Sequence, residues 1–391
     1  MVFYKDLHLK KIMTLLNDGN KSPRAMYVGG CVRDHILDLP IKDIDIATIH
    51  TPDKVTKILK QAFKILPIGI EYGTVVAVTP IGNVQITTLR HDIETNGRHA
   101  VVSFTDDWAE DAMRRDFTIN TLLMDMRGNI IDPLQAGIRD LKRGIVRVVG
   151  DADERVGEGV LRILRYVRFH ARFGRGALDN DYLKIFKQYK TLFQKLSRER
   201  VTEEILKTIQ YPSAFKYLKQ FERAQILPLP KIAQDQIKIF ETLSKSKLMS
   251  TELALALWAH GSRTKWNRIK SYLKLSNAAM MHIDYILQGQ KLFKATDRQT
   301  YLLLLYRYKR DVARHIIIFG LAKRGETSAR IKSELKKCDA LEAPVFPVSG
   351  KDLIARGFTA GPALGATLRA LETKWIKSGF KSASLDAMLR K

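Results

Sequence analysis

The sequence predicts an α+β protein, with a mixed sheet and helices in its first 150 residues and only helices beyond them. Up to Gly150, short runs rich in β-branched residues alternate with helical patterns, which indicates strands and helices in one layered domain. Beyond Gly150, apolar residues recur at helical spacing and no convincing strand pattern appears. The chain of 391 residues is long enough for two or more domains, each with its own core.

Basic residues outnumber acidic residues by a wide margin. The formal net charge is +25, although the hydrophobic fraction of 45% is that of an ordinary globular protein. Such a surplus favours a polyanionic partner, either nucleic acid or an anionic membrane. No apolar run approaches the ~18 residues of a membrane-spanning helix, so we expect a nucleic-acid partner and no membrane.

The two cysteines and the N-terminus bear on the compartment. Cys31 and Cys338 lie far apart in the sequence, which predicts a reducing environment and no disulfide framework. The first residues have an amphipathic helical pattern that ends at Gly19, without the apolar core and cleavage site of a secretory signal. We expect a cytoplasmic protein, and the pattern leaves the mitochondrial matrix open.

The stretch with the clearest chemistry begins with a short apolar strand at residues 25–28. Two glycines follow, Gly29 and Gly30, and then a helix that carries Arg33 and stops before Pro40. Backbone N–H groups at the start of a helix favour anions, phosphates above all. The sequence therefore predicts a phosphate-binding turn.

The next strand carries two aspartates, Asp43 and Asp45. Strand side chains alternate between faces, so these two carboxylates project to the same side. Paired carboxylates beside a phosphate-binding turn suit phosphoryl or nucleotidyl transfer, because Mg²⁺ takes oxygen ligands and stabilises the attacking and leaving oxygens. We interpret Asp43 and Asp45 as catalytic Mg²⁺ ligands; two solvated aspartates on an ordinary strand are the alternative.

The elements that follow read as a helix, three strands and a loop. The helix spans residues 52–63, and the strands span 64–67, 73–79 and 83–89, the last two joined by a hairpin turn. Residues 90–101 are polar, show no periodicity, and contain Arg90, Asp92 and Arg98. They predict either a mobile loop with a role in function or a plain surface loop.

A helix is expected over residues 108–124, with Arg114, Arg115 and Asp116 in its middle. Adjacent arginines on a helix project in different directions, so at most one packs along the helix while the other reaches towards phosphate or ribose. A solvated cluster of ion pairs is the alternative. The mixed portion closes with a hairpin over residues 123–132 and a strand over 145–149.

One long helix is expected over residues 154–174. Its apolar stripe has i, i+3, i+4 spacing, and four arginines occupy the flanking faces: Arg162, Arg165, Arg168 and Arg172. Four arginines after a candidate nucleotidyl-transfer site favour contacts with phosphates or bases, and a solvated basic helix surface is the alternative.

The remainder of the chain has a regular helical periodicity. Helices are expected over residues 192–209, 212–224, 232–244, 251–260, 264–275, 280–294, 298–309, 311–324 and 328–337, and a last one opens at Gly361–Pro362. Basic residues are spread throughout this half, as in proteins that follow an RNA or DNA backbone by contacts largely blind to sequence. Ordinary helix surface is the alternative.

Six motifs, in order along the chain, resemble those of the class II tRNA nucleotidyltransferases, the family of CCA-adding enzymes and bacterial poly(A) polymerases. They are GGCVRD…DIDIAT at 29–48, TTLR at 87–90, DWAEDAMRRDFTIN at 107–120, DPLQAGIRDL at 132–141, LRILRYVRF at 161–169 and GPALG at 361–365. They span nearly the whole chain. The last motif is similar to the CCA-adding branch found in α-proteobacteria.

The resemblance implies a polymerase-β-like nucleotidyltransferase head at residues 1–150. A helical neck that reads the nucleotide base would follow at 151–210, with an RNA-binding body at 211–340 and tail at 341–391. The implied activity is template-independent addition of C and A to the 3′ end of tRNA from CTP and ATP, with release of pyrophosphate. Mg²⁺ would be the cofactor, and the tRNA would be held by its acceptor and T arms.

The resemblance also implies roles for individual residues. The Mg²⁺ ligands are Asp43 and Asp45; the triphosphate contacts are Gly29, Gly30 and Arg33; the ribose and phosphate contacts are Arg114, Arg115, Asp116 and Asn120; the base-reading residues are Glu158, Arg162 and Arg165; and the flexible loop associated with switching from C to A addition contains Arg90, Asp92 and Arg98.

Two positions depart from the family pattern. Gly159 replaces the usual aspartate, which accepts from the exocyclic amino group of cytosine and adenine, so base discrimination falls by ~1–3 kcal/mol. Gln85 replaces the usual glutamate on the strand facing the two aspartates, and a glutamine neither adds charge to the metals nor accepts the 3′-hydroxyl proton. Two alternatives therefore stay open: poly(A) or single-nucleotide addition with altered base choice, and a non-catalytic RNA-binding protein that retains the fold.

Overall fold

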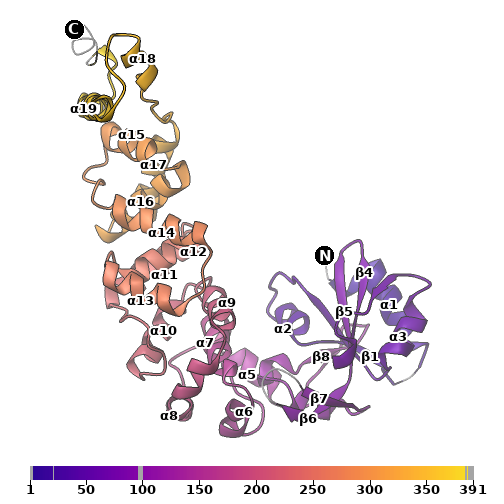
Figure 1. Ribbon diagram of the computed structural model, residues 1–391. Helices are drawn as coiled ribbons and strands as arrows, with labels where there is room; N and C mark the ends of the chain where they lie inside the picture. Colours follow the sequence, from indigo (N-terminus) through magenta and orange to yellow (C-terminus); the bar gives the residue numbers. More distant parts are fainter. Residues whose placement is uncertain (1–2, 21, 96–99, 384, 386–391) are drawn as a thin grey trace. The chain divides into compact units, whose positions relative to one another are not determined.

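The computed structural model describes residues 3–20, 22–95, 100–383 and 385 (Figure 1). The chain divides into two compact units. The first contains residues 1–208 and 217–228, and the second contains residues 209–216 and 229–391. Among the described residues, no helix is both long and apolar enough to cross a membrane.

A seven-stranded mixed sheet forms the N-terminal part of the first unit, in the order β3-β4-β5-β2-β1-β8-β9. Its strands are β1 (Ala25–Val28), β2 (Ile44–Thr48), β3 (Lys64–Leu66), β4 (Thr74–Thr79), β5 (Gly82–Thr88), β8 (Leu123–Met124) and β9 (Ile130–Ile131). β2 runs parallel to β5, whereas every other neighbouring pair in this sheet is antiparallel. The predicted mixed sheet is confirmed.

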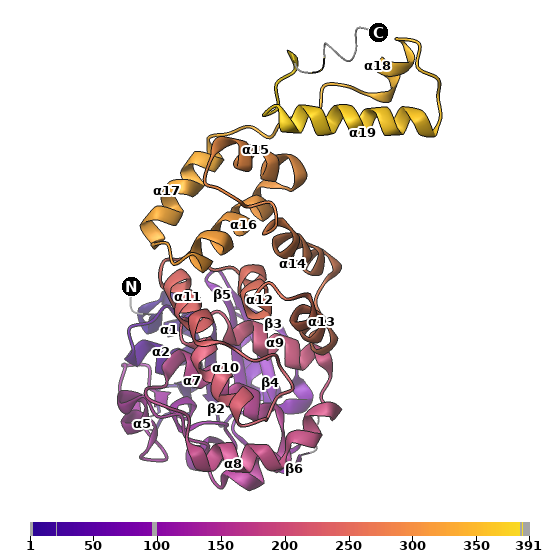
Figure 2. The ribbon, with the colours of Figure 1, turned by 90° about the vertical axis from the view of Figure 1, so that its left-hand side faces the viewer.

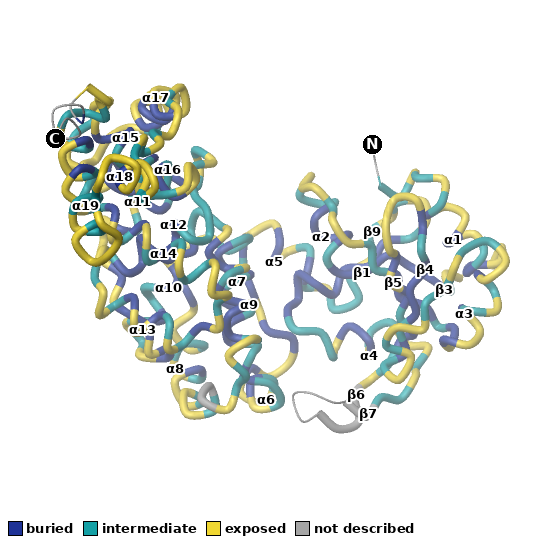
Figure 3. Tube along the Cα trace, turned by 45° about the horizontal axis from the view of Figure 1, so that its top comes forward, coloured by how far each residue is buried: buried dark blue, intermediate teal, exposed yellow. Residues whose placement is uncertain are grey.

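The sheet owes its stability to buried strands and to the helices packed on them. All residues of β1 are buried (Figure 3). Helix α1 (Leu7–Asn17) contacts both β1 and α3 (Pro52–Leu59). The apolar side chains that α1 contributes have helical spacing and are fully buried, and they are Leu9, Ile12, Met13 and Leu16.

Asn17, the last residue of α1, joins this helix to β1. Its amide nitrogen donates to the carbonyl oxygens of Met13 and Ala25 at 2.8 and 3.2 Å. Its oxygen accepts from the N–H groups of Arg24 and Ala25 at 2.7 and 3.1 Å. The full hydrogen-bonding capacity of this buried side chain is therefore used, and it fixes where the chain enters the sheet.

Residues 90–95 and 100–101 lie in two paired strands where the sequence predicted a loop, and residues 96–99 lie outside the described part of the chain. Strands β6 (Arg90–Thr95) and β7 (Ala100–Phe104) pair antiparallel as a separate two-stranded sheet. The prediction was wrong because a ribbon outside the main sheet does not require the alternation of apolar and polar residues that identifies a strand. Arg98 lies outside the described residues.

The predicted helix over residues 108–124 is also wrong beyond its first turns. Helix α4 (Trp108–Met113) ends before Arg114, and Thr118–Asn120 form a short 3₁₀ turn, η3. The backbone at Asp116 and Thr118 bonds to that of Val149 and Arg147, so it cannot continue a helix. Residues 147–149 pair with this irregular segment, so the strand expected at 145–149 is reduced to one bridge between Phe117 and Val148.

The long helix expected over residues 154–174 is two helices, α6 (Ala152–Glu158) and α7 (Leu161–Phe173). The break lies at Gly159, whose backbone is extended with φ −164° and ψ 97°. Glycine is a poor helix former because it loses the most backbone entropy on folding. Two further helices of this unit were not predicted, α5 (Gly137–Arg143) and most of α8 (Asn180–Gln188).

Helices follow throughout the rest of the described chain, as predicted. They are α9 (Arg198–Thr208), α10 (Ala214–Arg223), α11 (Gln234–Lys245), α12 (Thr251–Ala259), α13 (Arg263–Tyr272), α14 (Asn277–Gly289), α15 (Arg298–Arg307), α16 (Arg310–Lys323), α17 (Ser328–Asp339), α18 (Gly350–Ile354) and α19 (Pro362–Lys377). Between α7 and α9 lies a 3₁₀ segment, η4 (Lys190–Lys195).

Close helix packing characterises the second unit. A Cβ atom on Gly289 would collide with Ile316, and one on Gly320 would collide with Phe293, so these glycines let α14 and α16 approach closely. At the C-terminal end, α18 and α19 lie together (Figure 2) and enclose an apolar cluster that includes Trp375. The division of this region into body and tail stays a prediction.

We predict that Asn17→Ala lowers the free energy of unfolding of the first unit by ~2–4 kcal/mol, because the backbone N–H groups of half-buried Arg24 and buried Ala25 lose their partners. Urea denaturation of the full chain measures this. Asn83→Ala is the matched control, since Asn83 is an exposed asparagine on β5 of the same unit, and its effect should stay below ~0.5 kcal/mol. Equal effects of the two substitutions would contradict the role of Asn17.

Candidate active site

A cavity of about 900 Å³ lies within the first unit. It gathers residues from the sheet, from the segment after α4, and from α6 and α7. Of the site residues expected from the sequence, those that line it are Gly29, Gly30, Arg33, Asp43, Asp45, Arg90, Arg114, Arg115, Asp116, Asn120, Glu158, Arg162 and Arg165. Tyr72, Leu161, Phe169 and Arg200 also line it, and sequence reasoning had missed them.

The lining of this cavity is strongly cationic. Eight arginines and four carboxylates contribute to it. A concave site with this excess of positive charge concentrates polyanions such as nucleoside triphosphates. Within this field Asp43 and Asp45 lie side by side at the start of β2, the central strand of the sheet.

The start of β2 positions the two aspartates. Asp43 immediately precedes β2 and Asp45 is its second residue. Burial raises the pKa of the Asp45 carboxyl against the opposing charge of Arg115, and the charge of Asp43 raises it further. Two like charges held this close suit a divalent cation, which relieves their repulsion.

Gln85 lies directly beside Asp45. The parallel pairing of β2 with β5 places the two residues at the same register, so their side chains leave the sheet on the same face. Gln85 is exposed and does not line the cavity.

The glycine turn is packed against an arginine. Gly29 has φ 71°, a left-handed conformation that favours glycine. A Cβ atom there would lie 3.3 Å from a guanidinium nitrogen of Arg115. The absent side chain therefore lets Arg115 approach the backbone where α2 (Gly30–Ile36) begins.

Arg33, which follows the turn on α2, is buried and extensively hydrogen-bonded. Its Nε and one Nη donate to the same carboxylate oxygen of Asp34, at 2.9 and 2.7 Å, and its other Nη donates to the side-chain oxygen of Asn120. Its guanidinium also lies over the rings of Phe169 and Phe173. Each of its three nitrogens thus has a protein partner, and two N–H groups remain for a ligand.

These bonds belong to a series of six side chains that begins and ends on α7, so that the helix closes it into a ring. Asn120 donates to Asp116 at 2.9 Å, and Asp116 accepts from Arg165 at 2.9 Å. Arg172 donates to Asp34 at 2.7 Å. The six-residue ring therefore consists of Arg165, Asp116, Asn120, Arg33, Asp34 and Arg172. It closes through α7, because positions seven apart lie on one face of a helix.

Asp116 is kept ionised by its partners in the ring. Burial alone would raise the pKa of Asp116, but the charge of Arg165 and the hydrogen bond from Asn120 hold that pKa below its usual value. Asp116 therefore stays a charged acceptor within the cavity.

Asp111, which sequence reasoning missed, orients the two adjacent arginines. One of its oxygens accepts from Arg114 at 2.6 and 2.8 Å and the other accepts from Arg115 at 2.8 and 3.2 Å. The backbone N–H of Arg90 also donates to it, at 3.4 Å. Its spacing from the arginines, three and four residues on a helix, is a signal that could have identified it.

Arg90 is at the first position of the β6–β7 hairpin. Its side chain donates to the backbone oxygen of Tyr72, and both residues line the cavity. Asp92 lies on β6, and its side chain is outside the described part of the structure. The root of the hairpin is thus part of the cavity wall.

Glu158, the last residue of α6, lies between two arginines. Arg155 donates to it at 2.5 Å, and a guanidinium nitrogen of Arg162 lies 3.6 Å from the same oxygen. Arg155 also donates to the backbone oxygens of Arg114 and Arg115, and thereby joins α6 to the segment after α4. Burial, together with the charge of Arg155, lowers the pKa of Arg162.

Two relatives match the chain, one of them over almost its whole length. The CCA tRNA nucleotidyltransferase 1, mitochondrial, of Homo sapiens is 31% identical, in an alignment that covers 97% of this chain and 91% of that protein. A CCA-adding enzyme of Oceanobacillus iheyensis is 40% identical over 56% of this chain and 54% of that enzyme.

The chain is also similar to solved structures of CCA-adding enzymes. The Bacillus stearothermophilus CCA-adding enzyme in complex with CTP matches with a TM-score of 0.78 and 28% identity, and covers 97% of this chain and 95% of that one. The Thermotoga maritima CCA-adding enzyme complexed with tRNA has a TM-score of 0.66 at 21% identity, over 99% and 96% of the two chains, which shows the fold alone. The pattern of the poly A polymerase head domain matches residues 25–147. Because the human relative exceeds 30% identity over nearly the entire chain, this protein belongs to the CCA-adding family of tRNA nucleotidyltransferases.

Proposed function

We propose that the cavity is the site at which C and A are added to the 3′ end of tRNA without a nucleic-acid template. The 3′-hydroxyl of the tRNA attacks the α-phosphate of CTP or ATP, a new phosphodiester bond forms, and pyrophosphate leaves. The observation that carries the proposal is that paired aspartates and seven arginines from separate sequence motifs line one cavity.

Nucleotidyltransferases of this type generally use a divalent metal, and we propose Mg²⁺ held by Asp43 and Asp45. Their carboxylate oxygens are the ligands that Mg²⁺ prefers. Within the described part of the chain, no three His, Cys, Asp or Glu side chains gather as a complete metal site, so substrate phosphates and water would supply the other ligands. A cation bound there stabilises negative charge on the reacting phosphate.

Arg114 and Arg115 are the proposed triphosphate contacts, with Gly29, Gly30 and Arg33. The bonds from both arginines to Asp111 fix their orientation before a nucleotide binds, so less side-chain entropy is lost on binding. We infer that Asp116 and Asn120 hold the ribose with the hydrogen-bonding capacity that the six-residue ring leaves unused.

Glu158, Arg162 and Arg165 are the proposed base-reading residues. One Arg162 Nη has no hydrogen-bond partner among the residues that the structure describes, and such a donor suits the acceptor atoms on the edge of cytosine or adenine. Gly159, beside them, offers no side chain to the exocyclic amino group. Altered base choice is therefore the second candidate function, and Gly159 is the observation that favours it.

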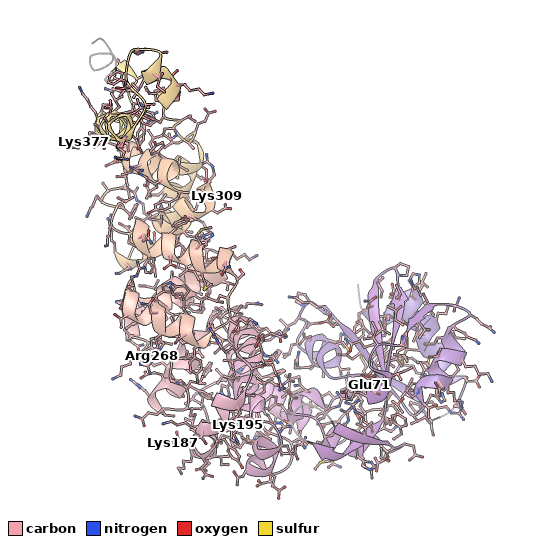
Figure 4. All side chains as sticks on the ribbon, viewed as in Figure 1. Glu71, Lys187, Lys195, Arg268, Lys309 and Lys377 are labelled. Carbon is pink, nitrogen blue, oxygen red and sulfur yellow. The ribbon has the colours of Figure 1, made fainter. Side chains whose placement is uncertain are left out.

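Exposed basic side chains of the helical second unit are the proposed tRNA contacts. Arg268, Lys309 and Lys377 lie on α13, before α16 and on α19, respectively (Figure 4). Such residues neutralise phosphates and recognise the shape of the acceptor and T arms without reading sequence.

The decisive experiment supplies tRNA lacking its CCA end, Mg²⁺, and labelled CTP or ATP. We expect the wild-type protein to add CCA. Asp45→Asn should lose on the order of 10²–10³-fold in rate or more, because the neutral asparagine no longer balances the positive charge of the cation. Asp53→Asn, an exposed aspartate on α3, is the control and should keep full activity.

The same assay separates the alternatives. A long A tail would support altered base choice, and absence of incorporation by wild-type protein that still binds tRNA would refute catalysis.

The six-residue ring gives a second prediction. Arg172 does not line the cavity, so Arg172→Met affects nucleotide binding through neighbouring side chains, among them Asp34, which bonds to Arg33. We expect a raised KM for CTP and ATP alike and ~1–3 kcal/mol less stability. Steady-state kinetics and urea denaturation measure these effects.

Arg175→Met, an exposed arginine three residues further on, is the control for that experiment. Loss of stability at unchanged KM would mean that the ring supports the fold alone.

Affinity for tRNA should depend steeply on salt. Contacts between many basic side chains and phosphates release counterions, so we expect a fall of roughly a hundredfold or more between about 50 and 200 mM salt. Filter binding at a series of salt concentrations measures it. A nearly constant affinity would exclude the proposed contacts with the tRNA backbone.

A further inference from the structure

A second cavity, of about 400 Å³, adjoins the first within the same unit. The end of α6, the start of α7, η4 and the start of α9 surround it. The two cavities share Glu158, Gly159, Leu161 and Arg200 in their linings. The break between α6 and α7 is therefore the place where they meet.

Gly159 keeps this junction open. A Cβ atom built on it would meet no other atom within 4 Å, so a side chain at this position would project into open space. Its φ of −164° is extended backbone that any residue adopts. The opening thus depends on the absence of a side chain and not on a strained backbone.

The wall of the second cavity has an aliphatic part and a polar part. Val160, Leu161, Leu192 and Leu196 supply the aliphatic surface, and the polar groups come from Glu158, Lys195, Ser197 and Arg200. Leu192 and Leu196 do not line the first cavity. Their aliphatic surface, which the first cavity lacks, suits an aromatic or aliphatic group.

We propose that the second cavity is an extension of the nucleobase site, which accepts an apolar substituent on the exocyclic amino group of the incoming nucleotide. The proposal rests on the proposed function, in which the base lies against Glu158 and Arg162. Gly159 follows Glu158, so a substituent that leaves the amino edge of the base passes Gly159 into the space between the leucines. N6-substituted adenosine and N4-substituted cytidine triphosphates form the ligand class.

The test compares ATP with N6-benzyl-ATP, each supplied with Mg²⁺ and tRNA that ends in CC. We expect the wild-type protein to add both nucleotides, with kcat/KM values within about tenfold of each other. Failure to add ATP itself would refute the proposed function. Addition of ATP with rejection of N6-benzyl-ATP would refute the extension alone.

Three variants establish where the benzyl group lies. Gly159→Val blocks the junction without supplying an acceptor to the amino group, and Leu196→Trp fills the far wall, so each should lower kcat/KM for N6-benzyl-ATP relative to ATP by roughly tenfold or more. Leu196→Ala enlarges the cavity and should leave that ratio unchanged or raise it. If Leu196→Trp fails to fold, addition of ATP is lost too, and the comparison of Gly159→Val with Leu196→Ala decides. An unchanged ratio in Gly159→Val would overturn the proposal.

Discussion

The six-residue ring is the interaction on which the first unit depends. Two arginines of α7, Arg165 and Arg172, each bond to an aspartate from the sheet-containing part, and Arg33 and Asn120 connect those aspartates. Each charged side chain of the ring has a hydrogen-bond partner within the ring. Because it contains three guanidinium groups and two carboxylates, its net charge is positive. A buried ionic network is stable only when each member has its partners. The same bonds that fix α7 therefore give the cavity its shape and its positive charge.

Much of this fold was predictable from local sequence. The strands of the main sheet and most later helices have the expected periodicity and turn residues. The errors arose where distant backbone decided the outcome. Residues 108–124 have helical propensity, but the backbone near Phe117 pairs with residues 147–149 instead. The break at Gly159 was overlooked because the apolar stripe continues in phase across it, although glycine is a weak helix former.

The residues of the candidate site that lie within recognisable sequence motifs were predictable. Nearly all of the site residues expected from the sequence line one cavity, and four of the six motifs contribute to it. The residues that orient them were harder to find. Asp111 has a local signal in its spacing from Arg114 and Arg115. The bond between Arg172 and Asp34 joins residues 138 positions apart, and no pattern within either segment indicates the other.

The parallel pairing of β2 with β5 has a consequence for the order of folding. β2 pairs with β1 across a short segment, whereas its pairing with β5 must wait until α3, β3 and β4 have bridged residues 49–81. Loop closure over such a distance is slow, because its entropy is lost before the contacts form. Asp45 acquires its neighbour on β5 only at that late step. In a nascent chain the turn at Gly29 and Gly30 can thus form before the pairing that gives Asp45 its neighbour Gln85.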